Sequence, residues 1–543
     1  MKQLSLALVP LLFTFAAEAK TIRLNPQNSQ PSVVREEAVR RDSAEKVVKV
    51  SFQLHKLHTK NARGRYVALS VDKLPLTSEV GLPALPFQAV TLDAAIADIR
   101  VAADLGEPVT VNVGRVLPAQ QEPCRCAVPV TPVFSDKIDN FAAAPSGFVL
   151  QSLGDYRGQP VSRVLLYPHK YDPKTGTLLL YPNAHFEISY SASAKALKTA
   201  DSIYDYLVIT PRDLMGGLNS WVDWKRSSQN IRFNVVAYED IGSPNTDALK
   251  TWIHNEYARA QFKYALIVGG KSRIPQQTVE TSTDKATPSD LPYFTMGGAD
   301  DVIPDVLAGR VVADNADVLQ RILKKWMDYE RGTGSEAGWH REIGIASNQG
   351  SGPSDAEYIG AIQDKMKTAF GTDPVYLFQN NPDSTADNFN AQMAQGAMWV
   401  TYIGHGSGIE WPSFGTSYTV PNAQAMRNAG AVKPVWIDVA CLNGTLEPAA
   451  AGATLTASAD PSGAPVGVTA YLGGTVLVSW HPPAIFARGV VFKMSQMVQP
   501  ILGEAIQAGQ RYLTENTSNV LDIASNQRWY HLQGDPSMRL RFK

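Results

Sequence analysis

Cysteine is scarce in this sequence, whose 543 residues include only Cys124, Cys126 and Cys441. So few cysteines exclude a disulfide framework as the main support of the fold. Cys124 and Cys126 are separated by one residue, so a bridge between them would be strained. Cys441 then has no obvious partner, and a thiol without a partner is a candidate nucleophile.

An excess of charge is also lacking. The formal net charge is −1, and charged residues make up 19% of the chain. We therefore expect neither a nucleic acid nor an anionic membrane as a main partner. The motifs G-x-S-x-G, H-E-x-x-H and C-x-x-C are absent. A serine site of the α/β-hydrolase type and a zinc site are therefore not expected.

Long hydrophobic runs are confined to the N-terminus. Lys2 precedes an apolar run from Leu4 to Phe15, and an A-x-A triplet follows at 17–19. This pattern is typical of a secretory signal peptide over residues 1–19. The run is too short to span a bilayer, and no other run is long enough. We expect the mature protein to be secreted or periplasmic, without a membrane span.

The rest of the chain divides into three regions. Residues 20–198 contain short alternating or apolar runs separated by Pro and Gly, which predict an all-β domain. The end of this region is a small, polar linker in which Lys195 and Lys198 are candidate processing points. Strand-like and helix-like segments alternate over residues 199–341 and 342–543. This alternation predicts two α/β subdomains with largely parallel sheets.

The stretch 399–444 combines two reactive side chains with strand patterns. The apolar runs 400–403 and 435–439 lead almost directly into His405 and Cys441, each among small residues. Such runs predict buried parallel strands, and functional groups collect beyond the carboxyl ends of such strands. If the two strands are neighbours, His405 and Cys441 meet at one edge of the sheet.

A thiol beside an imidazole is the minimal equipment for nucleophilic catalysis. The histidine removes the thiol proton or lowers the thiol pKa. The glycines on both sides of His405 allow a substrate backbone to approach closely. The alternative is a buried structural cysteine and an unrelated loop histidine.

Several motifs resemble the gingipain family of cysteine peptidases, most closely its Arg-specific members. Y-I-G-H-G-S (402–407) and D-V-A-C-L-N-G (438–444) resemble the His and Cys motifs of the family. V-G-L-P-A-L-P (80–86) and L-L-Y-P-H-K-Y-D-P-K-T-G-T-L-L-L-Y (165–181) resemble the gingipain pro-domain, and G-D-P-S (534–537) is similar to the closing motif. The resemblance implies a caspase-like α/β catalytic region preceded by a β-rich pro-domain that inhibits it intramolecularly. It implies protein or peptide substrates and no required cofactor.

The segment I-A-S-N-Q-G-S-G-P-S-D (345–355) resembles the one that supplies two acids in the Arg-specific gingipains. The match places Gln349 where the family has the glutamate that orients the catalytic histidine. A glutamine can hold the ring but adds no charge to stabilise an imidazolium. The match also places Asp355 at the base of the S1 pocket, where a carboxylate binds Arg bidentately and Lys as a point charge. Alternatively, Asp355 only caps the helix expected from Ala356.

Trp480 corresponds to a tryptophan that lines the same pocket, and its flat ring suits a guanidinium group. It is otherwise a core residue. Backbone N–H groups near Gly406 are expected to hold an oxyanion, and Ile403 and Gly404 to line the substrate site. His481 is a rival general base, although the two prolines that follow it favour a structural role.

Asp300, Asp301 and Asp305 form an acidic cluster. Carboxylates in a flexible loop suit a structural Ca²⁺ ion, and the alternative is a solvated turn.

The sequence therefore predicts a secreted cysteine endopeptidase that is made as a zymogen and prefers Arg or Lys at P1. Cys441 is the expected nucleophile, His405 the expected base and Gln349 its expected orienting partner. One alternative is a sortase-like transpeptidase on the same fold. The other is an exported binding protein with a decayed site, which the uncharged Gln349 would favour.

Overall fold

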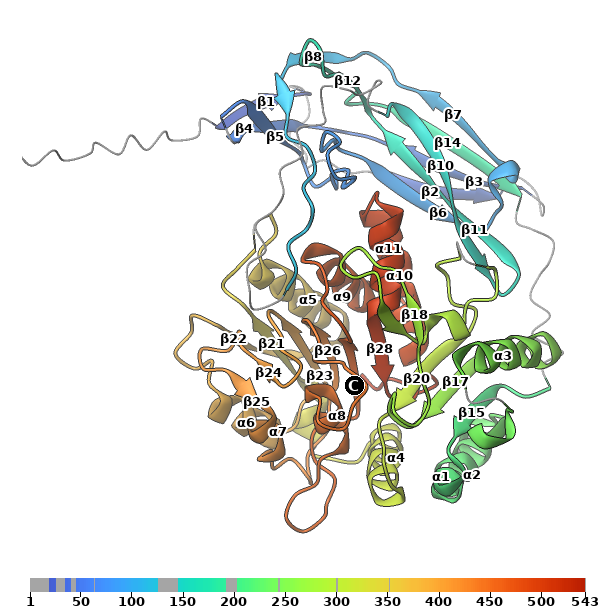
Figure 1. Ribbon diagram of the computed structural model, residues 1–543. Coiled ribbons are helices and arrows are strands. Elements are labelled where there is room, and N and C mark those ends of the chain that lie inside the picture. Colours follow the sequence, from blue (N-terminus) through green and yellow to red (C-terminus); the bar gives the residue numbers. More distant parts are fainter. Residues whose placement is uncertain are drawn as a thin grey trace, which may run out of the picture.

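The structure is a computed structural model with a β domain and an α/β part below it (Figure 1). It describes residues 19–25, 35–40 (backbone only), 45–62, 64–125, 145–191, 203–242, 245–298, 301–350 and 352–542. Residues 1–18 of the expected signal peptide, Cys126, Lys195, Lys198 and Asp300 lie outside the described residues.

Fourteen described strands form the β domain. They are β1 (Ala19–Arg23), β2 (Arg35–Arg40), β3 (Glu45–Ser51), β4 (Lys56–Ala62), β5 (Tyr66–Val71), β6 (Gln88–Leu92), β7 (Ile99–Asp104), β8 (Val109–Asn112), β9 (Arg115–Val116), β10 (Gly147–Tyr156), β11 (Gln159–Tyr167), β12 (His169–Asp172), β13 (Thr177–Leu180) and β14 (His185–Ser191). The sheet orders are β1-β4-β5-β9, β10-β11-β6, β12-β13-β8 and β2-β3-β14-β7. The predicted all-β character is confirmed, and β12 and β13 form an antiparallel hairpin.

One ten-stranded sheet runs through the whole α/β part. Its strands are β15 (Tyr206–Thr210), β16 (Phe233–Ala237), β17 (Tyr264–Val268), β20 (Leu307–Val311), β21 (Arg341–Ala346), β22 (Asp373–Phe378), β23 (Trp399–Ile403), β26 (Val435–Val439), β27 (Ala470–Gly474) and β28 (Tyr530–Gln533). The order is β16-β15-β17-β20-β28-β27-β26-β23-β21-β22. All neighbours are parallel except β27 and β28. The C-terminal strand β28 therefore joins the two predicted α/β halves.

Helices cover both faces of this sheet. They are α1 (Arg212–Met215), α2 (Asn219–Gln229), α3 (Thr246–Ala260), α4 (Ala316–Arg331), α5 (Asp355–Phe370), α6 (Ala386–Ala394), α7 (Val420–Gln424), α8 (Ala451–Ala457), α9 (His481–Met494), α10 (Leu502–Asn516) and α11 (Val520–Trp529). Alternate side chains of β23 enter different cores: Ile403 packs in the core that includes Ile359 of α5, and Val400 in the core that includes Phe389 of α6. Burial on both faces explains why these strands read as continuous apolar runs.

Two short hairpins, β18 (Gln277–Val279) with β19 (Thr287–Ser289) and β24 (Glu410–Trp411) with β25 (Tyr418–Thr419), lie in connections between sheet strands.

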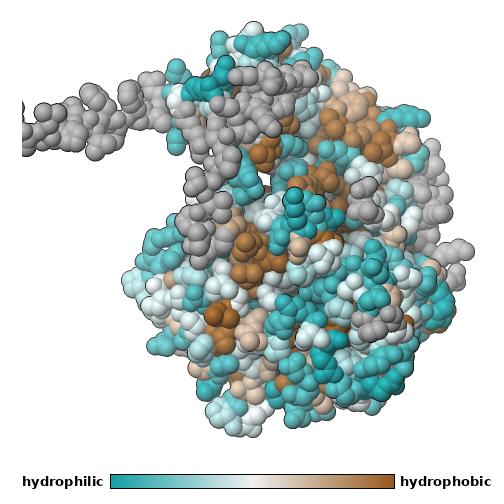
Figure 2. Space-filling model, viewed as in Figure 1, coloured by the Kyte–Doolittle hydropathy of each residue, from teal (hydrophilic) through white to brown (hydrophobic). Residues whose placement is uncertain are grey.

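The β domain is seated on the C-terminal helices of the α/β part. Arg163 of β11 donates to the carbonyl oxygen of Thr514 at 2.9 Å, and Thr91 of β6 contacts the Thr514 hydroxyl at 2.7 Å. At the edge of this interface, Arg511 pairs with Asp93 at 2.7 Å. Hydrophobic side chains are visible in the band where the two parts meet (Figure 2). The two parts are thus held by a mixed apolar and polar interface.

Candidate active site

His405 and Cys441 lie at the same edge of the sheet. Strands β23 and β26 are adjacent and parallel, with Ile403 opposite Val439, so both side chains follow their strands by two residues. The predicted adjacency of the two strands is confirmed. Directly after Cys441, Leu442 adopts a left-handed φ of 65°. A non-glycine residue in this region is strained, and here it turns the chain sharply behind the thiol.

Both ring nitrogens of His405 have partners. Nε2 lies 2.9 Å from Oε1 of Gln349, and Nδ1 lies 3.0 Å from the backbone carbonyl oxygen of Arg125. A carbonyl can only accept, so Nδ1 donates to Arg125. An amide can offer its oxygen to a protonated ring and its N–H to a neutral one. Gln349 can therefore hold His405 in both states without adding charge.

The Cys441 thiol is fully buried. Its Sγ accepts the backbone N–H of Val478 at 3.3 Å and donates to the Val478 carbonyl oxygen at 3.7 Å. Burial raises the pKa of Cys441 to about 11, against smaller opposing effects of the Val478 N–H and of Arg125. The sequence led us to expect a lowered thiol pKa. In this state the thiol is desolvated, and His405 is engaged by Arg125, so the thiol is protonated at neutral pH.

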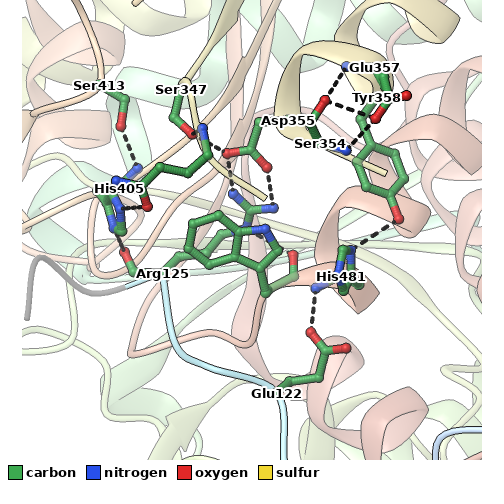
Figure 3. A network of polar contacts seen from close by, with 12 residues as sticks. Glu122, Arg125, Ser347, Ser354, Asp355, Glu357, Tyr358, His405, Ser413 and His481 are labelled. Carbon is green, nitrogen blue, oxygen red and sulfur yellow. Dashed lines mark hydrogen bonds and ion pairs between the residues drawn. The ribbon is translucent and has the colours of Figure 1, made fainter. Parts of the chain in front are cut away.

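A buried pocket beside these residues holds the side chain of Arg125 (Figure 3). Nη1 and Nη2 of Arg125 donate to the two carboxylate oxygens of Asp355 at 3.0 and 2.9 Å, and both side chains are fully buried. Ser347 donates to the same carboxylate at 2.5 Å. The Arg125 guanidinium lies 4.4 Å from the ring centroid of Trp480, and its Nε donates to the Trp480 carbonyl at 2.9 Å. Bidentate pairing and stacking are the features that recognise arginine.

Asp355 does not cap helix α5, because the preceding residue does. Ser354 is the N-cap of α5 and forms a capping box with Glu357. Asp355 is the first residue of α5, and its carboxylate points to Arg125. Trp480 is largely buried but forms a wall of the pocket rather than a purely apolar core contact.

Arg125 belongs to a segment that descends from the β domain to this edge of the sheet (Figure 1). Its backbone N–H donates to the Val478 carbonyl at 2.9 Å, and Cys124 pairs with Ser479 in antiparallel fashion. Cys124 is disulfide-bonded, whereas Cys441 is free. Sequence reasoning missed Arg125. A single arginine between two cysteines, in a chain with only three, is the signal that could have found it.

Ile403 and Gly404, the two residues before His405, were predicted to line the substrate site; the side chain of Ile403 does not reach it, and the role of Gly404 stays a prediction. Ile403 is fully buried in the core. A Cβ on Gly404 would lie 2.6 Å from the Cβ of Ser413, whose loop covers the end of β23. A Cβ on Gly406 would lie 2.3 Å from the Cys441 carbonyl, so this glycine allows the two loops to approach closely. Its role as an oxyanion donor stays a prediction.

The acidic loop binds the β domain. Asp301 accepts the backbone N–H of Asp155 at 3.3 Å, and Asp305 accepts that of Arg157 at 2.5 Å, both from the β10–β11 hairpin. Burial raises the pKa of each of these two carboxyls to about 6. Within the described parts of the chain, no group of three or more His, Cys, Asp and Glu side chains is arranged to hold a metal ion. Calcium at this loop stays a prediction.

A buried polar network beneath the site was also missed. Asp438 accepts from Trp411 at 2.7 Å and from Asn443 at 3.3 Å, and Asn443 in turn accepts the backbone N–H of Gly408 at 2.9 Å. It therefore ties the loop after His405 to the loop after Cys441. His481, the rival base, lies instead at the start of α9, where its Nδ1 is 3.4 Å from the Tyr358 hydroxyl.

Comparison with known proteins places this arrangement in a family. The model of peptidase family C25 matches residues 199–541. Lys-gingipain of Porphyromonas gingivalis is 24% identical in an alignment of 442 residues that covers 69% of this chain and 24% of the relative. The chain thus spans about a quarter of the length of the curated relatives it matches.

Two solved structures share the fold. The Arg-specific cysteine proteinase gingipain R (RgpB) matches with a TM-score of 0.56 and 23% identity over 64% of this chain and 79% of that one. The complex of P. gingivalis RgpB pro- and mature domains matches with a TM-score of 0.57 and 24% identity over 62% and 80%. The chain therefore belongs to peptidase family C25, and its α/β part has the caspase-like gingipain fold.

Proposed function

We propose that this chain is the latent form of a cysteine endopeptidase that cleaves peptides after arginine. The observation that supports this most strongly is the buried, bidentate ion pair between Asp355 and Arg125 beside His405 and Cys441. The pocket already holds a side chain with the chemistry of a P1 arginine. A lysine would reach Asp355 only as a point charge, so arginine is preferred.

In the active form, Cys441 Sγ attacks the scissile carbonyl carbon and forms a thioacyl bond. His405 accepts the thiol proton and passes it to the leaving amine, and it then activates the water that hydrolyses the thioester. Backbone N–H groups near Gly406 and Cys441 hold the oxyanion. Gln349 keeps the imidazole in place, as its 2.9 Å contact with His405 supports.

The β domain acts as an intramolecular inhibitor. Its Arg125 fills the pocket, and the Arg125 carbonyl occupies His405 Nδ1. The protein is exported, as the N-terminal pattern over residues 1–19 supports. Among the described residues, no helix is long and apolar enough to cross a bilayer.

Peptide reporters test this proposal. After removal of the β domain, peptides with P1 Arg should be cleaved faster than those with Lys, and those with Leu hardly at all. The Cys441→Ala variant should lose all cleavage, and retained activity in that variant would refute the proposal. Adding an amine nucleophile separates hydrolysis from acyl transfer, because a transpeptidase would give the amide product.

A further inference from the structure

Three residues before Arg125, the same segment makes a second polar contact with the α/β part (Figure 3). The Glu122 carboxylate accepts the backbone N–H of His481 at 2.8 Å. Cys124 forms an isolated antiparallel bridge with Ser479, and Glu122 lies two residues before it in the same segment. The Glu122 carboxylate therefore contacts the start of α9 while Arg125 fills its pocket.

The N-terminus of α9 suits a carboxylate. The first N–H groups of a helix lack intrahelical partners and carry partial positive charge. The N-cap residue of α9 is Trp480, and no side-chain cap hydrogen bond is made there. An indole can only donate. Pro482 and Pro483 have no N–H. The N–H of His481 is therefore the first donor of the helix that can serve a group outside it.

We infer that the N-terminus of α9 is a substrate subsite that prefers an acidic side chain at P4, three residues before the scissile arginine. This inference rests on the proposed function, because it takes Arg125 as the P1 residue. Glu122 then occupies P4, and Pro123 and Cys124 occupy P3 and P2. The preferred substrate is an extended peptide of the form Glu-x-x-Arg or Asp-x-x-Arg.

A nearby charge opposes this preference. Asp522 of α11 is buried, and burial, followed by the charges of Glu122 and Glu79, raises its pKa to about 7. When Asp522 is ionised it repels a P4 carboxylate. The preference is therefore stronger at pH 6 than at pH 8, and the Asp522→Asn variant should increase it at pH 8.

Labelling of the full chain tests the subsite. The double variant Arg125→Ala, Glu122→Ala removes the two side chains that anchor the segment, and chloromethyl ketones of the form X-Pro-Ala-Arg, which must displace the remaining backbone contacts, report binding through the rate of Cys441 alkylation at pH 6. With X as Glu, labelling should be roughly threefold to tenfold faster than with Gln, and slowest with Lys. Equal rates for Glu and Gln, or fastest labelling with Lys, would overturn the inference. If none of the three labels Cys441, the proposed function fails and the inference with it.

Two further variants in the same background identify the donor. His481→Ala keeps the backbone N–H and should keep the preference for Glu over Gln. Loss of the preference in this variant would assign recognition to the imidazole and contradict the backbone donor. With labelling repeated at pH 8, where Asp522 is ionised, Asp522→Asn should raise the Glu-to-Gln ratio, and a lower ratio would contradict the subsite geometry.

Discussion

Asp355 and Arg125 bury two opposite charges beside the nucleophile. Such a pair is tolerated only when its geometry is good and its remaining hydrogen bonds are made. Here Ser347 and the Trp480 carbonyl complete the set. Once the segment that carries Arg125 leaves the pocket, the Asp355 carboxylate has lost its cation. A P1 arginine that enters the pocket restores this ion pair, which favours its binding.

Replacing Asp355 should therefore change selectivity more than activity. In the activated enzyme, Asp355→Asn should lower kcat/KM for P1 Arg by about a hundredfold to several thousandfold, on the order of 3–5 kcal/mol, because one partner of a buried pair is lost. Cleavage after Leu should stay near its low baseline. Glu357→Gln is the matched control, because Glu357 lies in the same helix turn but belongs to the capping box and not to the pocket. An equal loss for Arg and Leu peptides would show that Asp355 is not the selector.

The thiol gives a pH prediction at the same scale. With the pKa of Cys441 raised to about 11, the thiolate fraction of the latent chain rises about tenfold per pH unit between pH 7 and 10. Iodoacetamide modification of Cys441, followed by peptide mass spectrometry, should show the same slope. A rate already constant at pH 7 in the latent chain would contradict the buried, protonated thiol.

Among the elements, the two loops after β23 and β26 are fixed to one another by Asn443. Its side chain bridges the Gly408 N–H and the Asp438 carboxylate, and it is fully buried. These loops carry His405 and Cys441, so their relative position depends on this bridge.

Asn443→Ala should leave the Gly408 N–H without its partner, remove one hydrogen bond to Asp438 and destabilise the fold by about 2 kcal/mol. Because the His405 loop loosens, kcat should fall while KM changes little. Asn348→Ala, which removes only an exposed contact with Asn380, is the control. Thermal unfolding and steady-state kinetics check both effects, and an unchanged kcat with the expected loss of stability would limit Asn443 to a structural role.

The elements also show what sequence patterns can and cannot predict. Strand β26 was predicted to the residue, because an apolar run marks it. Helices α9 to α11 were missed. In α9, buried residues occur all around the helix, so no amphipathic stripe marks it. Arg125 was missed because its meaning depends on Asp355, which lies 230 positions away.

For the whole molecule, three buried carboxyls face the β domain. Burial raises the pKa of Asp301 and Asp305 to about 6 and that of Asp522 to about 7, and Glu122 and Glu79 of the β domain add to the rise at Asp522. Asp155 opposes ionisation of Asp301, whereas Arg157 favours ionisation of Asp305. Undocking returns these groups to water, where carboxyl pKa values are about 4.

The docked state therefore binds more protons between about pH 4 and 7. Docking is strongest below pH 4 and weakens as the pH rises through 6 to 7. Hydrogen exchange of amides 153–157, corrected for intrinsic rates, should show roughly tenfold more protection at pH 5 than at pH 7. Asp301→Asn with Asp305→Asn should reduce this difference. Greater protection at pH 7 would contradict the sign of the linkage.

Latency through Arg125 is the central claim, and the rate of Cys441 labelling by a peptidyl-arginine chloromethyl ketone tests it most directly. The wild-type full chain and its Arg125→Ala variant are compared at pH 7.5, with Arg115→Ala, elsewhere in the β domain, as the control. We predict that Arg125→Ala is labelled at least about a hundredfold faster than wild type, because a buried ion pair no longer fills the pocket. Equal rates in all three proteins, or labelling that bypasses Cys441, would contradict the account.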